Sequence, residues 1–201
     1  MPKIREITTI LNQSLKDGNF HGRKFQDGVW YSLAYLVDRD EKRGDEIVTI
    51  RRPSIIDNLG EGTSVDYNDT YPIQFYHRIT APLQYVDMNN EGFGNPNSSN
   101  KEIADMVLIC IGDRARVGAY NEDICAAIVN DLTRELTPTQ LTTLALQSAT
   151  IEVIDTNLNP IEVFEQEYNG VDFALAPENF MISIRYRITT MYGKSCFTLC
   201  N

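Results

Sequence analysis

Histidine and cysteine are scarce in this chain of 201 residues, which has two histidines and four cysteines. His21 and His77 lie far apart in sequence, and nothing in the pattern brings either imidazole to Cys110 or Cys125. A cysteine nucleophile needs a neighbouring base that lowers its pKa, so thiol catalysis is not expected here. The two cysteines lie in the apolar runs "VLICIGD" and "EDICAAIV", where free cysteine behaves as a small buried hydrophobic residue.

Other ligand patterns are also missing. Cys196 and Cys200 in "SCFTLCN" would supply half the ligands of a structural zinc site, and no cluster of His or Cys accompanies them. The glycines of "EGFGNPN" follow no clear strand, open no helix and lack the lysine of a phosphate loop. The sequence therefore predicts no metal, no cofactor and no enzymatic activity.

Positive charge is under-represented, with 18 Lys and Arg against 28 Asp and Glu and a formal charge of -10. Binding of a phosphate backbone needs clustered positive charge, so tight binding to nucleic acid is not expected. No apolar run approaches the ~20 residues of a membrane span, and the start "MPKIREITTILNQ" lacks the pattern of a signal peptide. We expect a soluble protein made in the cytoplasm.

What is present is an amphipathic pattern in two places. The first segment has Ile4, Ile7, Ile10, Leu11 and Leu15 at helical spacing, which predicts a helix over residues 3–15. A second stripe predicts a helix over 120–136, with acidic residues near its N-terminus, where the helix dipole favours them. "TPTQ" at 137–140 matches a capping box before a short third helix.

Strand patterns separate these helices. The apolar run from Gly28 and the segment "EIVTIRR" flank the charged "DRDEKRGDE", which favours a hairpin or a long exposed turn. We predict strands over these residues: 46–51, 71–80, 104–111 and 180–191. Helices and strands in this order indicate an α+β fold with a mixed or antiparallel sheet backed by helices on one face.

The whole chain, 1–201, is predicted to form one domain, because its length and its hydrophobic content of 42% are ordinary for a single core. A segment at about 88–100 is rich in Asn, Gly and Ser, which predicts a flexible surface loop.

Two alternating strands carry arginine on the face opposite their apolar residues: Arg78 on one, and Arg185 and Arg187 on the other. Arginine suits subunit interfaces because its planar group pairs with carboxylates and tolerates partial desolvation. The carboxylates of a neighbouring copy are expected from these residues: Glu122, Asp123, Glu165 and Glu167. The alternative is a solvated sheet face whose ion pairs contribute little.

The order of elements carries a resemblance. It consists of the amphipathic first helix, the hairpin-like "AYLVDRDEKRGDEIVTI", the strand "YPIQFYHRIT", the strand-helix unit "ADMVLICIGDRARVGAYNEDICAAIVNDLTREL" and the closing strand "ENFMISIRYRITTMY". From Lys3 to Tyr192 the chain resembles phage tail-terminator and neck-ring proteins, and its style is similar to structural proteins of crAss-like Bacteroides phages. The Asn-rich loop and the cysteine-bearing end are departures from the family pattern.

That resemblance implies a tail-terminator-like domain that forms a homo-oligomeric ring of six or twelve copies. Such a ring belongs to the neck or tail of a virion, is assembled in the host cytoplasm, and joins head to tail or completes the tail. It surrounds the passage for DNA and contacts other neck, portal or tail proteins. Two alternatives stay open: a phage assembly or adaptor protein acting as a monomer or dimer, and an enzyme whose site the sequence does not reveal.

Overall fold

The computed structural model describes residues 2–20, 23–24, 27–56, 62–87, 99–171 and 175–193. Its helices are α1 (Pro2–Asp17), α2 (Arg114–Val117), α3 (Asn121–Leu132), α4 (Pro138–Thr143) and α5 (Pro160–Glu167). Its strands are β1 (Asn19–Phe20), β2 (Arg23–Lys24), β3 (Val29–Arg43), β4 (Glu46–Ile56), β5 (Gly62–Ser64), β6 (Ile73–Ile79), β7 (Gln84–Asp87), β8 (Ser99–Asp113), β9 (Ser148–Asn157) and β10 (Asn179–Gly193).

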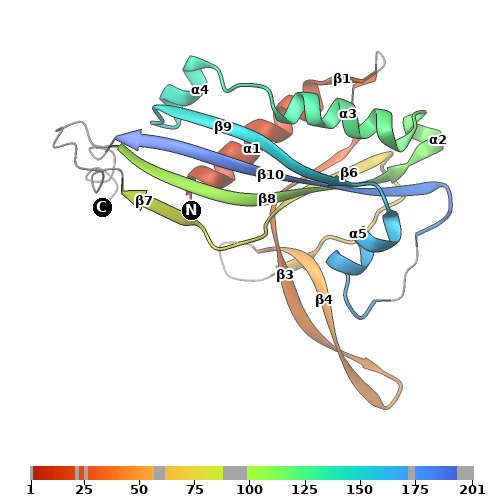
Figure 1. Ribbon diagram of the computed structural model, residues 1–201. Coiled ribbons are helices and arrows are strands. Elements are labelled where there is room, and N and C mark those ends of the chain that lie inside the picture. Colours follow the sequence, from red (N-terminus) through yellow and green to blue (C-terminus); the bar gives the residue numbers. More distant parts are fainter. Residues whose placement is uncertain are drawn as a thin grey trace.

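Eight of the described strands form one twisted sheet in the order β5-β4-β3-β6-β8-β10-β9, with β7 also paired to β8 (Figure 1). All pairs in this sheet are antiparallel except β3 with β6, so the sheet is mixed. β10 lies between β8 and β9, which confirms that the strand predicted at 180–191 is internal. This position gives its long apolar face two neighbours and removes it from the sheet edge.

The helices α1, α3 and α4 lie over one face of the sheet, above it in Figure 1, and we call this face the helix side. Ile7 of α1, Ile128 of α3 and Ile184 of β10 all belong to the main buried cluster there, with Phe75 and Leu108. The apolar stripe predicted for the first helix faces this cluster, with Ile4, Ile7, Leu11 and Leu15 buried and Ile10 only partly buried at its margin. The capping box at Thr137 is also present, because its hydroxyl accepts from the Gln140 N–H and the Gln140 side chain accepts from Thr137 N–H.

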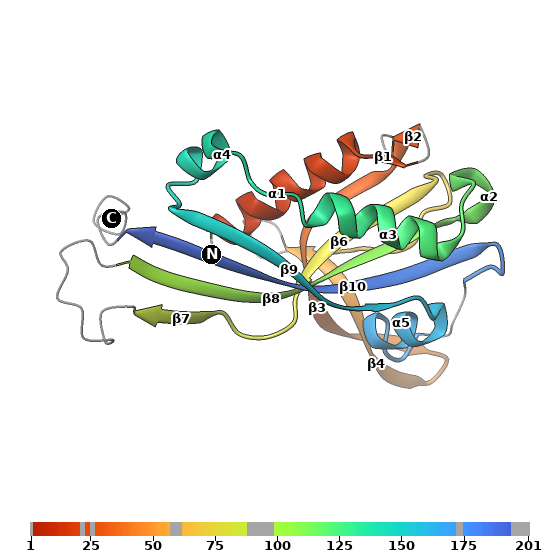
Figure 2. The same ribbon diagram turned by 45° about the horizontal axis from the view of Figure 1, so that its top comes forward.

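The opposite face of the sheet, which we call the lower face, carries α5 under one half (Figures 1 and 2). Val163 and Phe164 of α5 join Tyr76, Ile109 and Met181 in a second buried cluster. The expectation that helices back only one face is therefore wrong. Helix α5 forms because Asn159 caps it and Pro160 starts it, and its apolar residues then bury the sheet residues beneath them.

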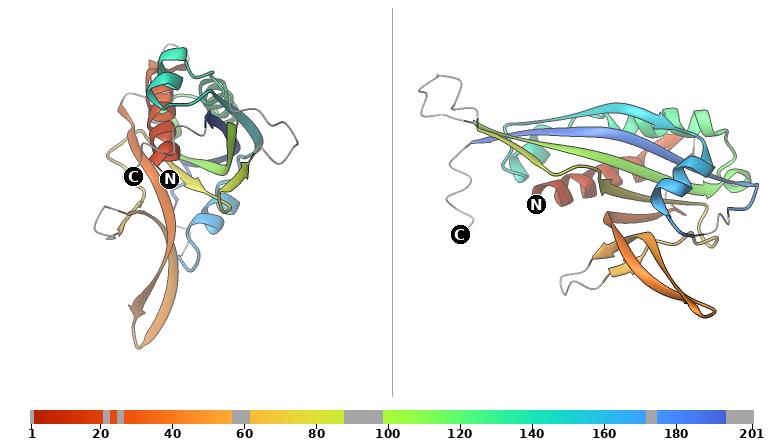
Figure 3. Two further views of the ribbon diagram at one scale, coloured as in Figure 1. Left: turned by 90° about the vertical axis from the view of Figure 1, so that its left-hand side faces the viewer. Right: turned by 60° about the horizontal axis from the view of Figure 1, so that its bottom comes forward.

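A two-stranded arm projects from the lower face (Figure 1 and Figure 3, left). It consists of the paired ends of β3 and β4, from Tyr35 opposite Ser54 to Arg43 opposite Glu46, and it turns at Gly44. The turn needs a positive φ at Gly44, which glycine adopts without strain. The charged segment therefore forms the end of a hairpin, which confirms the first of the two structures expected from the sequence, a hairpin or a long exposed turn.

Two expectations fall wholly or partly outside the described residues. The predicted loop at about 88–100 lies there except for the residues that begin β8, and Cys196 and Cys200 lie there as well. In the described part of the chain, no helix combines the length and the apolar composition needed to cross a membrane.

Candidate interaction surfaces

The strand registers place the lower face in rows across β8, β10 and β9. The first row contains Val107, Arg185 and Asp155, and Arg78 of β6 extends it on the far side of β8. The second row sets Arg187 between Asp105 and Glu152. Two further rows follow toward the sheet end: Ile103, Thr189 and Thr150, then Lys101, Met191 and Ser148.

No described element covers these rows beyond α5, as the view from below shows (Figure 3, right). We call this surface the open half-face. It consists of Lys101, Ile103, Asp105, Thr150, Glu152, Asp155, Arg185, Arg187, Thr189 and Met191.

Arg78 is committed inside the subunit. Its Nη2 lies 2.5 Å from Glu167 Oε1 and its Nε donates to Glu167 Oε2 at 3.0 Å. The Tyr76 hydroxyl donates to the same oxygen, and burial together with this carboxylate raises the tyrosine pKa well above its usual value. The Glu167 side chain is 2% exposed. This pair ties α5 to the sheet, so a contact with a second copy is not needed to satisfy either charge.

Arg187 and Arg185 differ in their partners although both lie on the open half-face. Arg187 Nε donates to Asp105 Oδ1 at 2.7 Å, and this bond is the main reason that the Asp105 pKa is lowered. Arg185 is exposed and forms no ion pair among the described residues. The Arg185 charge also helps to lower the Asp105 pKa, but the side chain is exposed and can still contact a partner. The charge of Arg187 is largely balanced by its strand neighbours.

The other predicted acidic contacts lie apart from these arginines. Glu122 and Asp123 are exposed in the first turn of α3, on the helix side of the sheet. Glu165 is exposed on α5. Their role as contacts between copies stays a prediction, and the fold does not bring them to Arg185 within one subunit.

The arm is held in place by the loop after α5. Arg51 N–H donates to the Asn169 carbonyl at 2.8 Å, and Arg43 Nη2 donates to the Gly170 carbonyl at 3.0 Å. Gly170 has a φ of 78° and approaches the arm so closely that a side chain there would contact the Thr49 carbonyl. The arm is therefore fixed at its middle.

The end of the arm, Lys42–Ile47, is exposed, and we call it the arm tip. The long side chain of Arg43 reaches back from the tip to the Gly170 carbonyl. Ile47 is 74% exposed, the second-largest exposure among the described large apolar residues. An apolar side chain held in water at the end of a fixed projection is typical of an interaction surface.

On the helix side, His77 belongs to a buried polar network. Its Nδ1 lies 2.7 Å from the Tyr186 hydroxyl and its Nε2 lies 2.8 Å from Asn12 Oδ1. Because Asn12 Nδ2 donates to the Tyr31 carbonyl, Oδ1 must accept, so Nε2 carries the proton and Tyr186 donates to Nδ1. Burial lowers the His77 pKa to about 3. This neutral imidazole is a satisfied core group, with no open position for a substrate.

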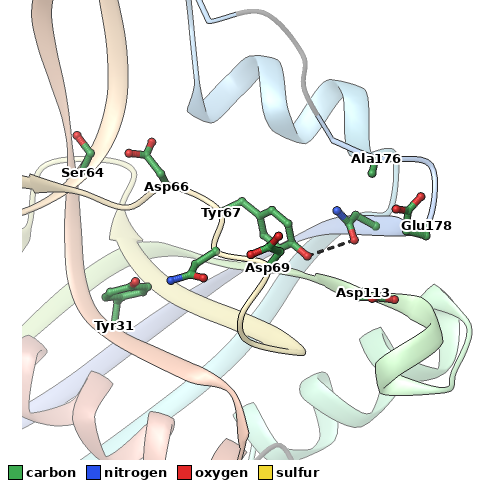
Figure 4. Close-up of a pocket in the computed structure, with 10 residues that line it drawn as sticks. Tyr31, Ser64, Asp66, Tyr67, Asp69, Asp113, Ala176 and Glu178 are labelled. Atoms are coloured by element: carbon green, nitrogen blue, oxygen red, sulfur yellow. Dashed lines mark hydrogen bonds between the residues drawn. The ribbon is translucent and has the colours of Figure 1, made fainter.

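A hollow of about 810 Å³ lies between the base of the arm and the start of β10 (Figure 4). Its lining includes two tyrosines and four carboxylates, and the Tyr67 hydroxyl donates to Asn179 Oδ1 at 3.2 Å. Burial raises the pKa of Tyr67, and nearby carboxylates raise it further. One of the four carboxylates, Asp113, caps α2. Within the described ranges, no three His, Cys, Asp or Glu side chains are placed to hold a metal ion.

Sequence reasoning missed Asp105, the arm tip and the Arg78–Glu167 pair. Asp105 could have been found, because it has the same parity on β8 as the lower-face residues Val107 and Ile109. Helix α5 also had a signal in the Asn159-Pro160 start and in the spacing of Val163, Phe164, Glu167 and Tyr168.

Comparison with known proteins adds no assignment to this geometry: no protein-family model matches the chain, and no curated protein matches it significantly.

Proposed function

We propose that this chain is a structural subunit of an oligomeric ring in the neck or tail of a phage virion. The ring joins head to tail or completes the tail, surrounds the passage for DNA and contacts other neck, portal or tail proteins. It is built in the host cytoplasm and stays in the virion. The order of helices and strands motivates the family, and one structural observation carries the proposal, namely the fixed arm with its exposed tip.

The arm argues for assembly because a two-stranded ribbon beyond the body of a protein is marginally stable by itself. The contacts at Asn169 and Gly170 hold the arm, but none of the described residues covers Ile47 at the tip. A second copy supplies the missing surface. Fixing the arm in advance also lowers the entropy cost of that contact.

The charge of the chain fits the proposed place. At -10 the subunit repels a phosphate backbone, and a ring of such subunits allows DNA to pass without gripping it.

The test is the mass of the purified full-length chain in solution. Size-exclusion chromatography with light scattering should give a mass six or twelve times 22.8 kDa, and negative-stain electron microscopy should show closed rings. The unchanged chain is compared with an Ile47→Ser variant. This substitution removes the exposed apolar group at the tip and leaves the buried clusters untouched. Reduced assembly of this variant with an unchanged melting temperature supports the arm as the contact. A monomer or dimer at every concentration would instead favour the adaptor alternative.

A further inference from the structure

We infer that the arm tip of one copy docks on the open half-face of a second copy. This inference rests on the proposed function, because it requires that the chain self-associates. It names the two surfaces that meet, and it replaces the acidic turn of α3 with the arm tip as the partner of Arg185.

Charge is the first argument. Most charged groups of the arm are already engaged: Asp38 with Arg51, Glu41 with Arg52, and Asp40 as acceptor from Thr49.

At the tip, Asp45 and Glu46 are exposed and form no ion pair among the described residues. On the lower face, Arg78 and Arg187 are paired and Arg185 is not.

Among the described residues, each surface has unpaired charges of both signs, because Lys42 is exposed at the tip and Glu152 is exposed on the open half-face. An orientation that sets Asp45 and Glu46 against Arg185 pairs opposite charges, and such pairing fixes orientation in protein association.

Apolar groups give the second argument. Ile47 lies two residues after Asp45 at the arm tip, so a partner surface that meets Asp45 also meets the isoleucine. The open half-face provides partly exposed apolar side chains in Ile103 and Met191, and the neighbouring Ile154 of β9 is 47% exposed. A surface that sets partly exposed apolar side chains beside arginine matches the composition of protein interfaces.

Geometry gives the third argument. Nine residue pairs in the arm span about 30 Å at ~3.4 Å per residue. The contacts of Arg43 and Arg51 hold the arm so that it points away from the sheet (Figure 3, left). The tip therefore does not fold back on its own half-face, and the two complementary surfaces meet only between copies.

A charge-exchange experiment tests this contact. The face variant carries Arg185→Glu, and the arm variant carries Asp45→Lys with Glu46→Lys. Each variant alone sets like charges against each other and should self-associate at least about tenfold more weakly than the unchanged chain. A one-to-one mixture pairs each surface with an opposite charge and should restore the original mass. Circular dichroism and melting temperature check folding, and all three positions are exposed.

A third variant, Glu122→Lys with Asp123→Lys, is the matched control on the helix side. It should assemble like the unchanged chain and should not rescue the face variant. In a separate measurement, Arg185→Lys keeps the charge and permits carbodiimide coupling to carboxylates, and mass spectrometry should find the product joined to Asp45 or Glu46 of another copy.

Three results would overturn the inference. If the face and arm variants both assemble normally while the unchanged chain is oligomeric, the proposed function stands and this contact is wrong. If the α3 variant, and not the arm variant, rescues the face variant, the acidic partner is the first turn of α3. If the unchanged chain is monomeric at every concentration, the inference and the proposed function both fail.

Discussion

Acid should destabilise the fold through His77, and a single substitution isolates the effect. His77 is neutral in the native state, with a pKa of about 3 against 6.5 in an exposed histidine. Between these values the unfolded chain binds a proton that the native chain does not, so stability falls as pH falls from 6.5 toward 3. At about pH 4.5, two units below the unfolded pKa, the loss is about 2.7 kcal/mol at about 1.36 kcal/mol per unit.

Other groups titrate in the same range, so the measurement is a comparison with His77→Gln. Glutamine can accept from Tyr186 and donate to Asn12 but takes up no proton. Asp105, with a lowered pKa, adds to acid destabilisation, and Asp131, with a raised pKa, opposes it. Both are shared by the two proteins and cancel in the difference between them.

The assay is urea unfolding at about pH 7 and about pH 4.5. The unchanged chain should lose about 2–3 kcal/mol more than His77→Gln between the two conditions. Nuclear magnetic resonance gives a second readout, because the chain has only two histidines. The chemical shifts of the His77 imidazole should keep their neutral values down to about pH 4. Equal losses in the two proteins, with an imidazole that titrates near 6.5, would refute the buried neutral network.

Three more substitutions have expected outcomes. Ile184→Ala should cost about 2–5 kcal/mol in urea unfolding, because its side chain is fully buried in the main cluster, and a cost below about 1 kcal/mol would contradict that packing. Glu167→Ala leaves the Arg78 guanidinium, whose side chain is 16% exposed, without its carboxylate and should cost about 3–5 kcal/mol. The exposed Glu165→Ala on the same helix should change stability by less than about 0.5 kcal/mol. Cys196→Ser with Cys200→Ser should leave folding and assembly unchanged in reducing buffer, and stoichiometric zinc by elemental analysis would contradict this.

The alternation of side chains predicted the faces of the strands well. Phe75, Ile182 and Ile184 lie under the helices and Arg185 and Arg187 lie on the other side, because a strand of fixed parity cannot exchange its faces. The positions of α1, α3 and α4 followed from spacing and caps for the same local reason, whereas α5 was not predicted. These features are decided within a few residues of each other, so the sequence contains them.

The alternation of side chains could not predict which residues of one strand face are covered by another element. Arg78 and Arg185 have the same face and lie on either side of Val107 in one row, yet α5 covers the first and leaves the second open. Which of them is paired depends on Glu167, which is 89 residues from Arg78 in sequence. The acids were assigned by composition alone, and composition does not tell a buried carboxylate from a solvated one.

The arm restricts the symmetry of the assembly, because its tip and the open half-face are different surfaces of one subunit. If the arm of each copy reaches the face of the next, the contact is head-to-tail and propagates until a ring closes or a filament grows. If two copies exchange arms reciprocally, a two-fold axis satisfies both contacts and growth stops at a dimer. The two arrangements use the same Arg185 contact, so the charge exchange does not separate them, but the mass does. A species of twice 22.8 kDa with both arms engaged assigns the chain to the adaptor alternative, whereas a larger closed species is required for a ring that surrounds DNA.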